Sequence, residues 1–78
     1  MANVLIYSTP ICGYCKMAKE FFTKNNIPYT EINVQGNPAK AQEMIQKSHQ
    51  MGVPVIDIDG KVVVGFDKTK IKALLGLS

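Results

Sequence analysis

The chain contains no arginine, so its nine basic residues are all lysines. Proteins that read nucleic acids usually depend on arginine for bidentate contacts with bases and phosphates. The lysines are spread along the 78 residues, and the formal net charge is only +3. We therefore expect solvated lysines on helix faces and no nucleic-acid partner. The charge predicts a mild attraction of anionic small molecules and acidic proteins.

Long apolar runs are also absent. No stretch approaches the roughly 20 apolar residues that a membrane-spanning helix needs. The first residues lead into a predicted strand without the charged and apolar regions of a signal peptide. These absences predict a cytoplasmic protein without membrane contact. Hydrophobic content of 46% with 19% charged residues is typical of a globular chain, and the length fits one domain over residues 1–78.

Only two cysteines are present, Cys12 and Cys15. A disulfide between residues this close closes too small a loop to stabilise a small domain strongly. In a reducing compartment such a pair is more often catalytic or metal-binding than structural. Zinc needs four nitrogen or sulfur ligands, and the only other soft ligand is His49, far along the chain. We therefore expect no metal site, and we expect His49 on the surface.

The hydrophobic pattern predicts seven elements in the order βαβαββα. Strands are expected at 3–7, 27–34, 53–58 and 61–64, and helices at 13–25, 38–50 and 68–75. Strands separated by helices should be parallel, and a tight turn at Asp59-Gly60 should add an antiparallel edge. Asn37 and Asp67 are suited to cap helices. The predicted core includes Met17, Phe21, Phe22 and Met44.

The pair of cysteines falls at the junction between the first loop and the first helix. A thiol at this position lies at the positive end of the helix dipole, among unpaired N–H groups, and both stabilise a thiolate. The thiolate is the nucleophile in disulfide exchange. Lys16 and Lys19 are expected to add positive charge nearby. The residues thus predict a thiol–disulfide oxidoreductase.

Three further segments make the prediction more specific. Tyr14 precedes the second cysteine, Val53-Pro54 precedes the third strand, and Gly65-Phe66-Asp67 precedes the last helix. In order and spacing, these segments and the C-x-x-C motif resemble the glutaredoxin family nearly end to end. The resemblance implies an α/β, thioredoxin-like fold, in which a four-stranded mixed sheet is flanked by three helices.

The resemblance also implies a role for each of these residues. Cys12 would be the exposed nucleophile of low pKa, and Cys15 the buried thiol that resolves the mixed disulfide. A cis Pro54 would place the backbone of Val53 beside them. The segment 65–67 would hold the γ-glutamyl end of glutathione.

Two aromatic residues complete the predicted site. Tyr14 is expected to form a wall for the substrate, whereas Phe66 either packs under the last helix or lines the groove. Glutathione would be a co-substrate with no tightly bound cofactor. The partners would be glutathionylated or disulfide-containing proteins, and the molecule would be a monomer.

Some positions depart from the family pattern. Glutaredoxins commonly carry a lysine at the position of Thr9, and often a basic residue at that of Met51 and a threonine at that of Gly52. Gln50 is a partial substitute for the missing cation. Gly13 stands where proline is usual.

Three readings therefore stay open. The first is glutathione-dependent reduction of disulfides. The second is a redoxin that is recharged by thioredoxin reductase and feeds electrons to ribonucleotide reductase or a similar enzyme. The third is a dimer that binds an iron–sulfur cluster with glutathione.

Overall fold

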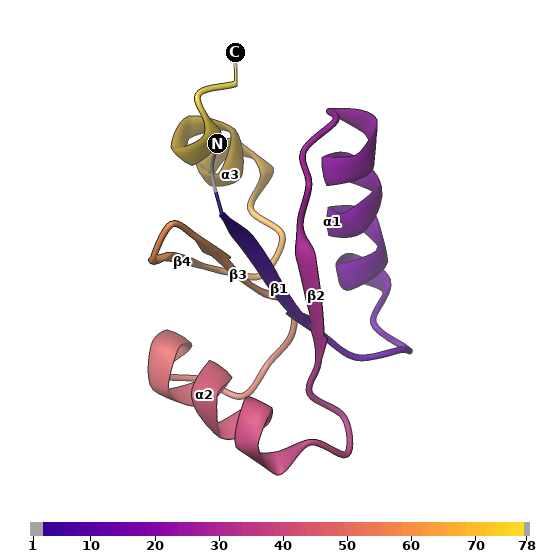
Figure 1. Ribbon diagram of the computed structural model, residues 1–78, viewed down its shortest axis with the longest axis vertical. Coiled ribbons are helices and arrows are strands. Elements are labelled where there is room, and N and C mark those ends of the chain that lie inside the picture. Colours follow the sequence, from indigo (N-terminus) through magenta and orange to yellow (C-terminus); the bar gives the residue numbers. More distant parts are fainter. Residues whose placement is uncertain (1–2, 78) are drawn as a thin grey trace.

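The computed structural model describes residues 3–77 and contains the seven elements in the predicted order. The strands are β1 (Val4–Ser8), β2 (Thr30–Asn33), β3 (Val55–Ile58) and β4 (Lys61–Val64), and the helices are α1 (Gly13–Lys24), α2 (Pro38–Ser48) and α3 (Lys68–Leu75). The strands lie in the order β2-β1-β3-β4. The strand that leads to the cysteines is therefore paired on both sides (Figure 1).

The direction of the third strand differs from the prediction. β1 and β2 are parallel, but β3 pairs with β1 antiparallel, with Tyr7 opposite Val55. The expectation of a parallel third strand is therefore wrong. A parallel crossover must return the chain along the full length of the sheet. Here α2 lies across the end of the sheet where β2 finishes, so the chain enters β3 from that same end (Figure 1).

The sheet separates two apolar clusters. On one face, α1 and α3 cover a cluster that includes Ile6, Phe22 and Ile71, all fully buried. On the other face, α2 covers a smaller cluster around Tyr7 and Met44. The alternation of side chains along β1 places Ile6 and Tyr7 on opposite faces.

The ends of the elements follow local chemistry. The side chains of Asn37 and Asp67 accept hydrogen bonds from the helix N–H groups three residues on, which confirms both predicted caps. The two-residue turn at Asp59-Gly60 is also confirmed, with φ of 53° and 88°.

Four predicted elements are shorter in the structure: β2 covers 30–33 instead of 27–34, α1 ends one residue earlier than predicted, and β3 and α2 are shortened as well. β3 begins after Pro54, which has no N–H to donate to a ladder. α2 ends at Ser48 because His49 adopts a left-handed conformation with φ of 61°. Across the described residues 3–77, no helix has the length and apolar character needed to cross a membrane.

Candidate active site

Cys12 is the N-cap residue of α1. Its sulfur accepts a hydrogen bond from the Cys15 N–H at 3.1 Å, and its carbonyl accepts one from the Lys16 N–H at 3.2 Å. The sulfur therefore takes the place that a serine or aspartate oxygen occupies in ordinary caps. Because the first-turn N–H groups and the helix dipole both favour negative charge, this position stabilises a thiolate.

The two cysteines form a disulfide, with Cα atoms 5.2 Å apart. Their environments differ. Cys15 is buried at 1% exposure against the sheet, whereas Cys12 is half-buried at the start of the helix. A partner in solution can thus reach the first sulfur far more readily than the second. This asymmetry agrees with the order of attack that the sequence resemblance implies.

Three segments that are distant in sequence meet at one end of the sheet. The cysteine loop follows the carboxyl end of β1, while Val53-Pro54 precedes the amino end of β3. Gly65-Phe66-Asp67 follows the carboxyl end of β4. Tyr7 pairs with Val55, and Val55 pairs with Val64. The register therefore brings together the segments that the sequence singled out.

The Val53–Pro54 peptide bond is cis, as predicted. The Pro54 carbonyl accepts a hydrogen bond from the Gly65 N–H at 2.8 Å, which ties two walls of the site together. The Gly65 N–H is therefore not available to a ligand. Within residues 3–77, the N–H groups of Phe66 and Asp67 have no acceptor, and the backbone of Val53 has no partner.

The aromatic residues of the site occupy different environments. Tyr14 is 65% exposed and lines a hollow of about 450 Å³ with Gly13 and Met17. The ring of Phe66 lies 5.9 Å from that of Phe21. Phe66 is half-buried against the core and also lines a hollow beside α1.

An apolar rim surrounds the site, and the sequence did not predict it. The large apolar side chains exposed within residues 3–77 are Ile11, Tyr14, Met17, Met51 and Val64, and all lie in or next to the three segments. The prediction that Met17 belongs to the core is wrong. Met17 is 49% exposed, because the buried stripe of α1 runs through Cys15, Ala18 and Phe22 instead. Exposed apolar residues gathered in one place mark an interaction surface.

Lys19 does not add free charge to the site as expected. Its Nζ lies 2.8 Å from Glu31 Oε2, which also accepts a hydrogen bond from the Ser8 hydroxyl at 2.8 Å. The hydrogen bonds from Lys19 and then Ser8 hold the pKa of the Glu31 carboxyl below its ordinary value. The three side chains connect α1 to β1 and β2 next to the cysteine loop.

A second polar cluster lies on the face covered by α2. Lys47 Nζ donates to Asp57 Oδ2 and to the Tyr7 hydroxyl, both at 2.8 Å, and the same hydroxyl donates to Glu43. The hydrogen bonds to Asp57 and Tyr7 raise the pKa of Lys47. Burial and the bond to Glu43 raise the pKa of Tyr7, so its hydroxyl stays protonated at neutral pH. No sequence pattern pointed to Asp57, so this cluster was not predicted.

Gln50 was expected to replace a missing cation. Its Nε2 instead donates to the Gly52 carbonyl at 3.1 Å, so one of its two donor hydrogens is engaged within the chain. Its Oε1 lies 3.0 Å from the position that a Cβ atom on residue 52 would take. A threonine at residue 52 would therefore require Gln50 to move.

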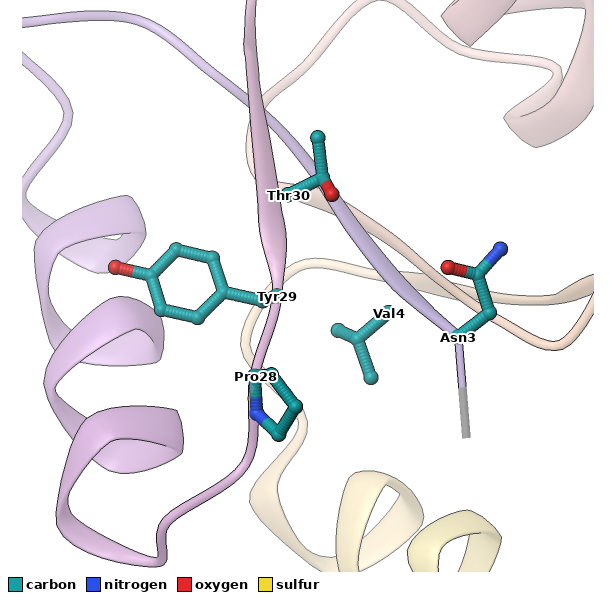
Figure 2. Close-up of a pocket in the computed structure, with 5 residues that line it drawn as sticks. All are labelled: Asn3, Val4, Pro28, Tyr29 and Thr30. Atoms are coloured by element: carbon teal, nitrogen blue, oxygen red, sulfur yellow. The ribbon is translucent and has the colours of Figure 1, made fainter. Parts of the chain in front are cut away.

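A pocket at the opposite end of β1 is lined by no cysteine among the described residues. It has a volume of about 160 Å³ and is lined by Asn3, Val4, Pro28, Tyr29 and Thr30 (Figure 2). Tyr29 points toward a helix, and its ring lies 5.8 Å from that of Phe22. Among residues 3–77, no three histidine, cysteine or acidic side chains gather in a group that could hold a metal ion.

Comparison with known proteins adds independent findings. A family model described as Glutaredoxin matches residues 4–63. The sequence is 44% identical over 72 residues to an uncharacterised glutaredoxin-like 8.6 kDa protein in the rubredoxin operon of Clostridium pasteurianum, covering 92% of this chain and 96% of that one. It is 40% identical over 67 residues to glutaredoxin 3 of Escherichia coli, covering 86% and 81% of the two chains.

The fold of this chain is also similar to that of a solved glutaredoxin structure. The crystal structure of a buckwheat glutaredoxin–glutathione complex superposes with a TM-score of 0.77 at 27% identity, over 96% of this chain and 71% of the buckwheat chain.

Proposed function

Because the chain belongs to the glutaredoxin family and has its thioredoxin-like fold, we propose that it reduces glutathione mixed disulfides and protein disulfides with glutathione as the reductant. In general terms, the chain is a thiol–disulfide oxidoreductase. The observation that carries the proposal is the accessible Cys12 sulfur at a helix N-terminus, bonded to the buried Cys15.

The first step uses the reduced protein. The Cys12 thiolate attacks one sulfur of a substrate disulfide, and a new bond joins the two sulfur atoms. The other substrate sulfur leaves as a thiolate and takes a proton from water. The Cys15 N–H, 3.1 Å from the Cys12 sulfur, favours the charged form of the nucleophile before attack.

The second step depends on the substrate. With a protein disulfide, Cys15 loses its proton to solvent and attacks the Cys12 sulfur. This releases the second substrate thiol and leaves the Cys12–Cys15 disulfide, so two electrons have passed to the substrate. With a glutathionylated protein, Cys12 keeps the glutathionyl group. A second glutathione thiolate then attacks that group, forms glutathione disulfide and releases the Cys12 thiolate.

The segment 65–67 supports glutathione as the reductant. The N–H groups of Phe66 and Asp67 precede α3 and have no acceptor within residues 3–77, so they are suited to a carboxylate. The Asp67 carboxylate, which also caps α3, is suited to an ammonium group. The buckwheat relative was crystallised with glutathione. The backbone of Val53, which forms no hydrogen bond within residues 3–77, would pair with the backbone of the bound thiol compound.

A dithiol that works as a reductant must be returned to the reduced state after each turnover. We therefore propose that the reaction takes place in the cytoplasm, where the thiol pool is reducing. No resident cofactor enters this scheme.

The decisive experiment is turnover of a glutathionylated peptide by the protein with glutathione. We expect Cys12→Ser to lose activity, because it removes the nucleophile. We expect Cys15→Ser to keep activity on this substrate but to lose the dithiol reaction with protein disulfides. An active Cys12→Ser protein would refute the assignment of the nucleophile.

A second candidate is recharging by thioredoxin reductase. It is favoured by Met51, which is 80% exposed and apolar where glutathione-using relatives often carry a cation. An NADPH assay of the oxidised protein with thioredoxin reductase and no glutathione distinguishes the two. Fast NADPH oxidation there, with slow reduction by glutathione, would replace the first proposal with the second.

A further inference from the structure

A groove runs from the cysteine loop along α1 toward α3. Its first hollow is lined by Gly13, Tyr14 and Met17. Met17 also lines the next hollow, with Phe21 and Phe66. A third hollow shares Phe21 and two lysines with the second. Because neighbouring hollows share side chains, they follow one another along the face of α1, which begins at Gly13, the residue after Cys12; we call this row of hollows the groove.

The far end of this groove is cationic. Lys24 and Lys68 line both of its distal hollows, and Lys72 lines the last one. None of the three forms an ion pair within residues 3–77, whereas Lys19, Lys40 and Lys47 do. Glu20 is the one acidic side chain that the described residues contribute to the groove wall. Three ammonium groups around one hollow repel each other, so an anionic occupant is favoured there.

The near end of the groove is apolar. Tyr14 and Met17 are 65% and 49% exposed, and Phe66 continues the apolar lining. Farther along, the Lys68 ammonium lies 5.6 Å from the centre of the Phe21 ring, at the change from apolar to charged lining. The groove therefore offers apolar contacts close to Cys12 and positive charge farther away. A small anion would use only the far end, whereas a polypeptide bound at the cysteine would use both.

The spacing sets the length of the occupant. From Gly13 to Lys24, α1 rises about 16 Å at 1.5 Å per residue. An extended peptide covers that distance in about five residues. We infer that the groove binds the segment of a protein disulfide substrate that carries aspartate or glutamate about five residues from its reacting cysteine. This inference rests on the proposed disulfide reductase activity.

The test uses synthetic peptides whose single cysteine is linked by a disulfide to thionitrobenzoate. Cys12 attacks the peptide sulfur, the new S–S bond joins peptide and protein, and thionitrobenzoate leaves and absorbs light. One pair of peptides carries two glutamates centred five residues before or after the cysteine. A second pair has glutamine at the same positions. The rate constant for reaction with the reduced protein is measured by stopped flow.

We expect one of the two acidic peptides to react about threefold to tenfold faster than its glutamine counterpart. The difference should shrink in 0.5 M salt because exposed charges are screened. The variant Lys24→Gln/Lys68→Gln should lose the difference while it reacts normally with the glutamine peptides. The matched control Lys61→Gln/Lys70→Gln removes the same charge from outside the groove. It should keep the difference in rate between the acidic and the glutamine peptides.

Equal rates for acidic and glutamine peptides would overturn the inference and leave the reductase proposal intact. Equal effects of the two double variants would also overturn it, because net charge alone would then explain the preference. A single-stranded oligonucleotide that competes as well as a free acidic peptide would overturn the choice of occupant. Failure of every peptide to react would instead count against the reductase activity itself.

Discussion

Glutathione use can be tested by replacing Met51 with a lysine that could form an ion pair with a carboxylate of glutathione. The Met51 side chain is 80% exposed and lies two residues before the cis Val53–Pro54 bond, on the rim of the site. We expect Met51→Lys to lower the KM for glutathione about twofold to fivefold, because an exposed ion pair with a carboxylate contributes up to about 1 kcal/mol. The assay is turnover of a glutathionylated peptide over a range of glutathione concentrations.

The matched control for this substitution is Gln46→Lys, which adds the same charge to an exposed position of α2. It should leave the KM unchanged. An equal change in both variants would mean that net charge, and not a contact in the site, attracts glutathione.

Lys47 is the residue on which the polar cluster under α2 depends. Asp57 is buried, and loss of its cation leaves a carboxylate whose remaining hydrogen bond comes from the Gly60 N–H. We expect Lys47→Met to reduce the free energy of unfolding by about 2 kcal/mol. Lys40→Met, on the same helix, breaks an exposed pair with Glu43 and should cost about 0.5 kcal/mol or less. Urea unfolding of the two variants measures both values, and equal losses would contradict the role given to Lys47.

At the scale of elements, Glu31 connects β2 to α1 through Lys19 and to β1 through Ser8. Its pKa is lowered by folding, so its contribution to stability is present at neutral pH. That contribution is lost as the pH falls below about 4.5, through the pKa of the folded state. Acid should therefore weaken this connection first through protonation of Glu31.

We expect Glu31→Gln to lose less stability than the wild type between pH 7 and pH 3, by about 0.5 kcal/mol, since the pair is partly exposed. Urea unfolding at the two pH values measures the difference. Glu20→Gln, which removes an acid that forms no ion pair within residues 3–77, is the control. A Glu31→Gln protein with the same pH dependence as the wild type would refute the argument.

The elements also mark the limits of sequence reasoning. Asn37, Asp67 and Asp59-Gly60 act through neighbours within three residues, so their roles could be predicted from local sequence. The antiparallel direction of β3 could not, because it depends on where α2 lies against the sheet. Local helical spacing likewise placed Met17 in the core, although its exposure depends on which face of α1 meets the sheet.

The same distinction applies to the site. Cys12, Cys15 and the cis Pro54 could be predicted because short motifs carry them. The bonds from Lys47 to Tyr7 and Asp57 join residues 40 and 10 positions apart, and no local pattern signals them. Five exposed apolar residues on separate segments form a rim only after folding. The exposure of these five side chains could not be predicted from the sequence pattern alone.

At the scale of the whole molecule, the margin of stability is narrow. A chain of this length is expected to have a free energy of unfolding of about 4–12 kcal/mol. Phe22 is fully buried between α1 and the sheet, so Phe22→Ala should cost about 3–5 kcal/mol, a large part of that margin. Met17→Ala, on the exposed face of the same helix, should change the stability by less than about 0.5 kcal/mol. Circular dichroism during heating compares them, and a cost below 1 kcal/mol for Phe22→Ala would contradict the core described above.

The molecule as a whole is expected to be a monomer. The iron–sulfur reading predicts instead a coloured, glutathione-dependent dimer after anaerobic reconstitution. A colourless monomer in visible absorbance and size-exclusion measurements would exclude that reading.

The central position of β1 has a consequence for how the protein is inactivated by proteolysis and oxidation. Because β1 is hydrogen-bonded on both sides, its amides belong to the part of the molecule that opens last, and the cysteine loop is anchored directly to that part. Hydrogen exchange at Ile6 and Tyr7 should therefore require global unfolding. Proteases and oxidants that act through partial opening would attack the two edge strands long before they released the resolving thiol. The protein would then lose its redox activity and its fold in the same event.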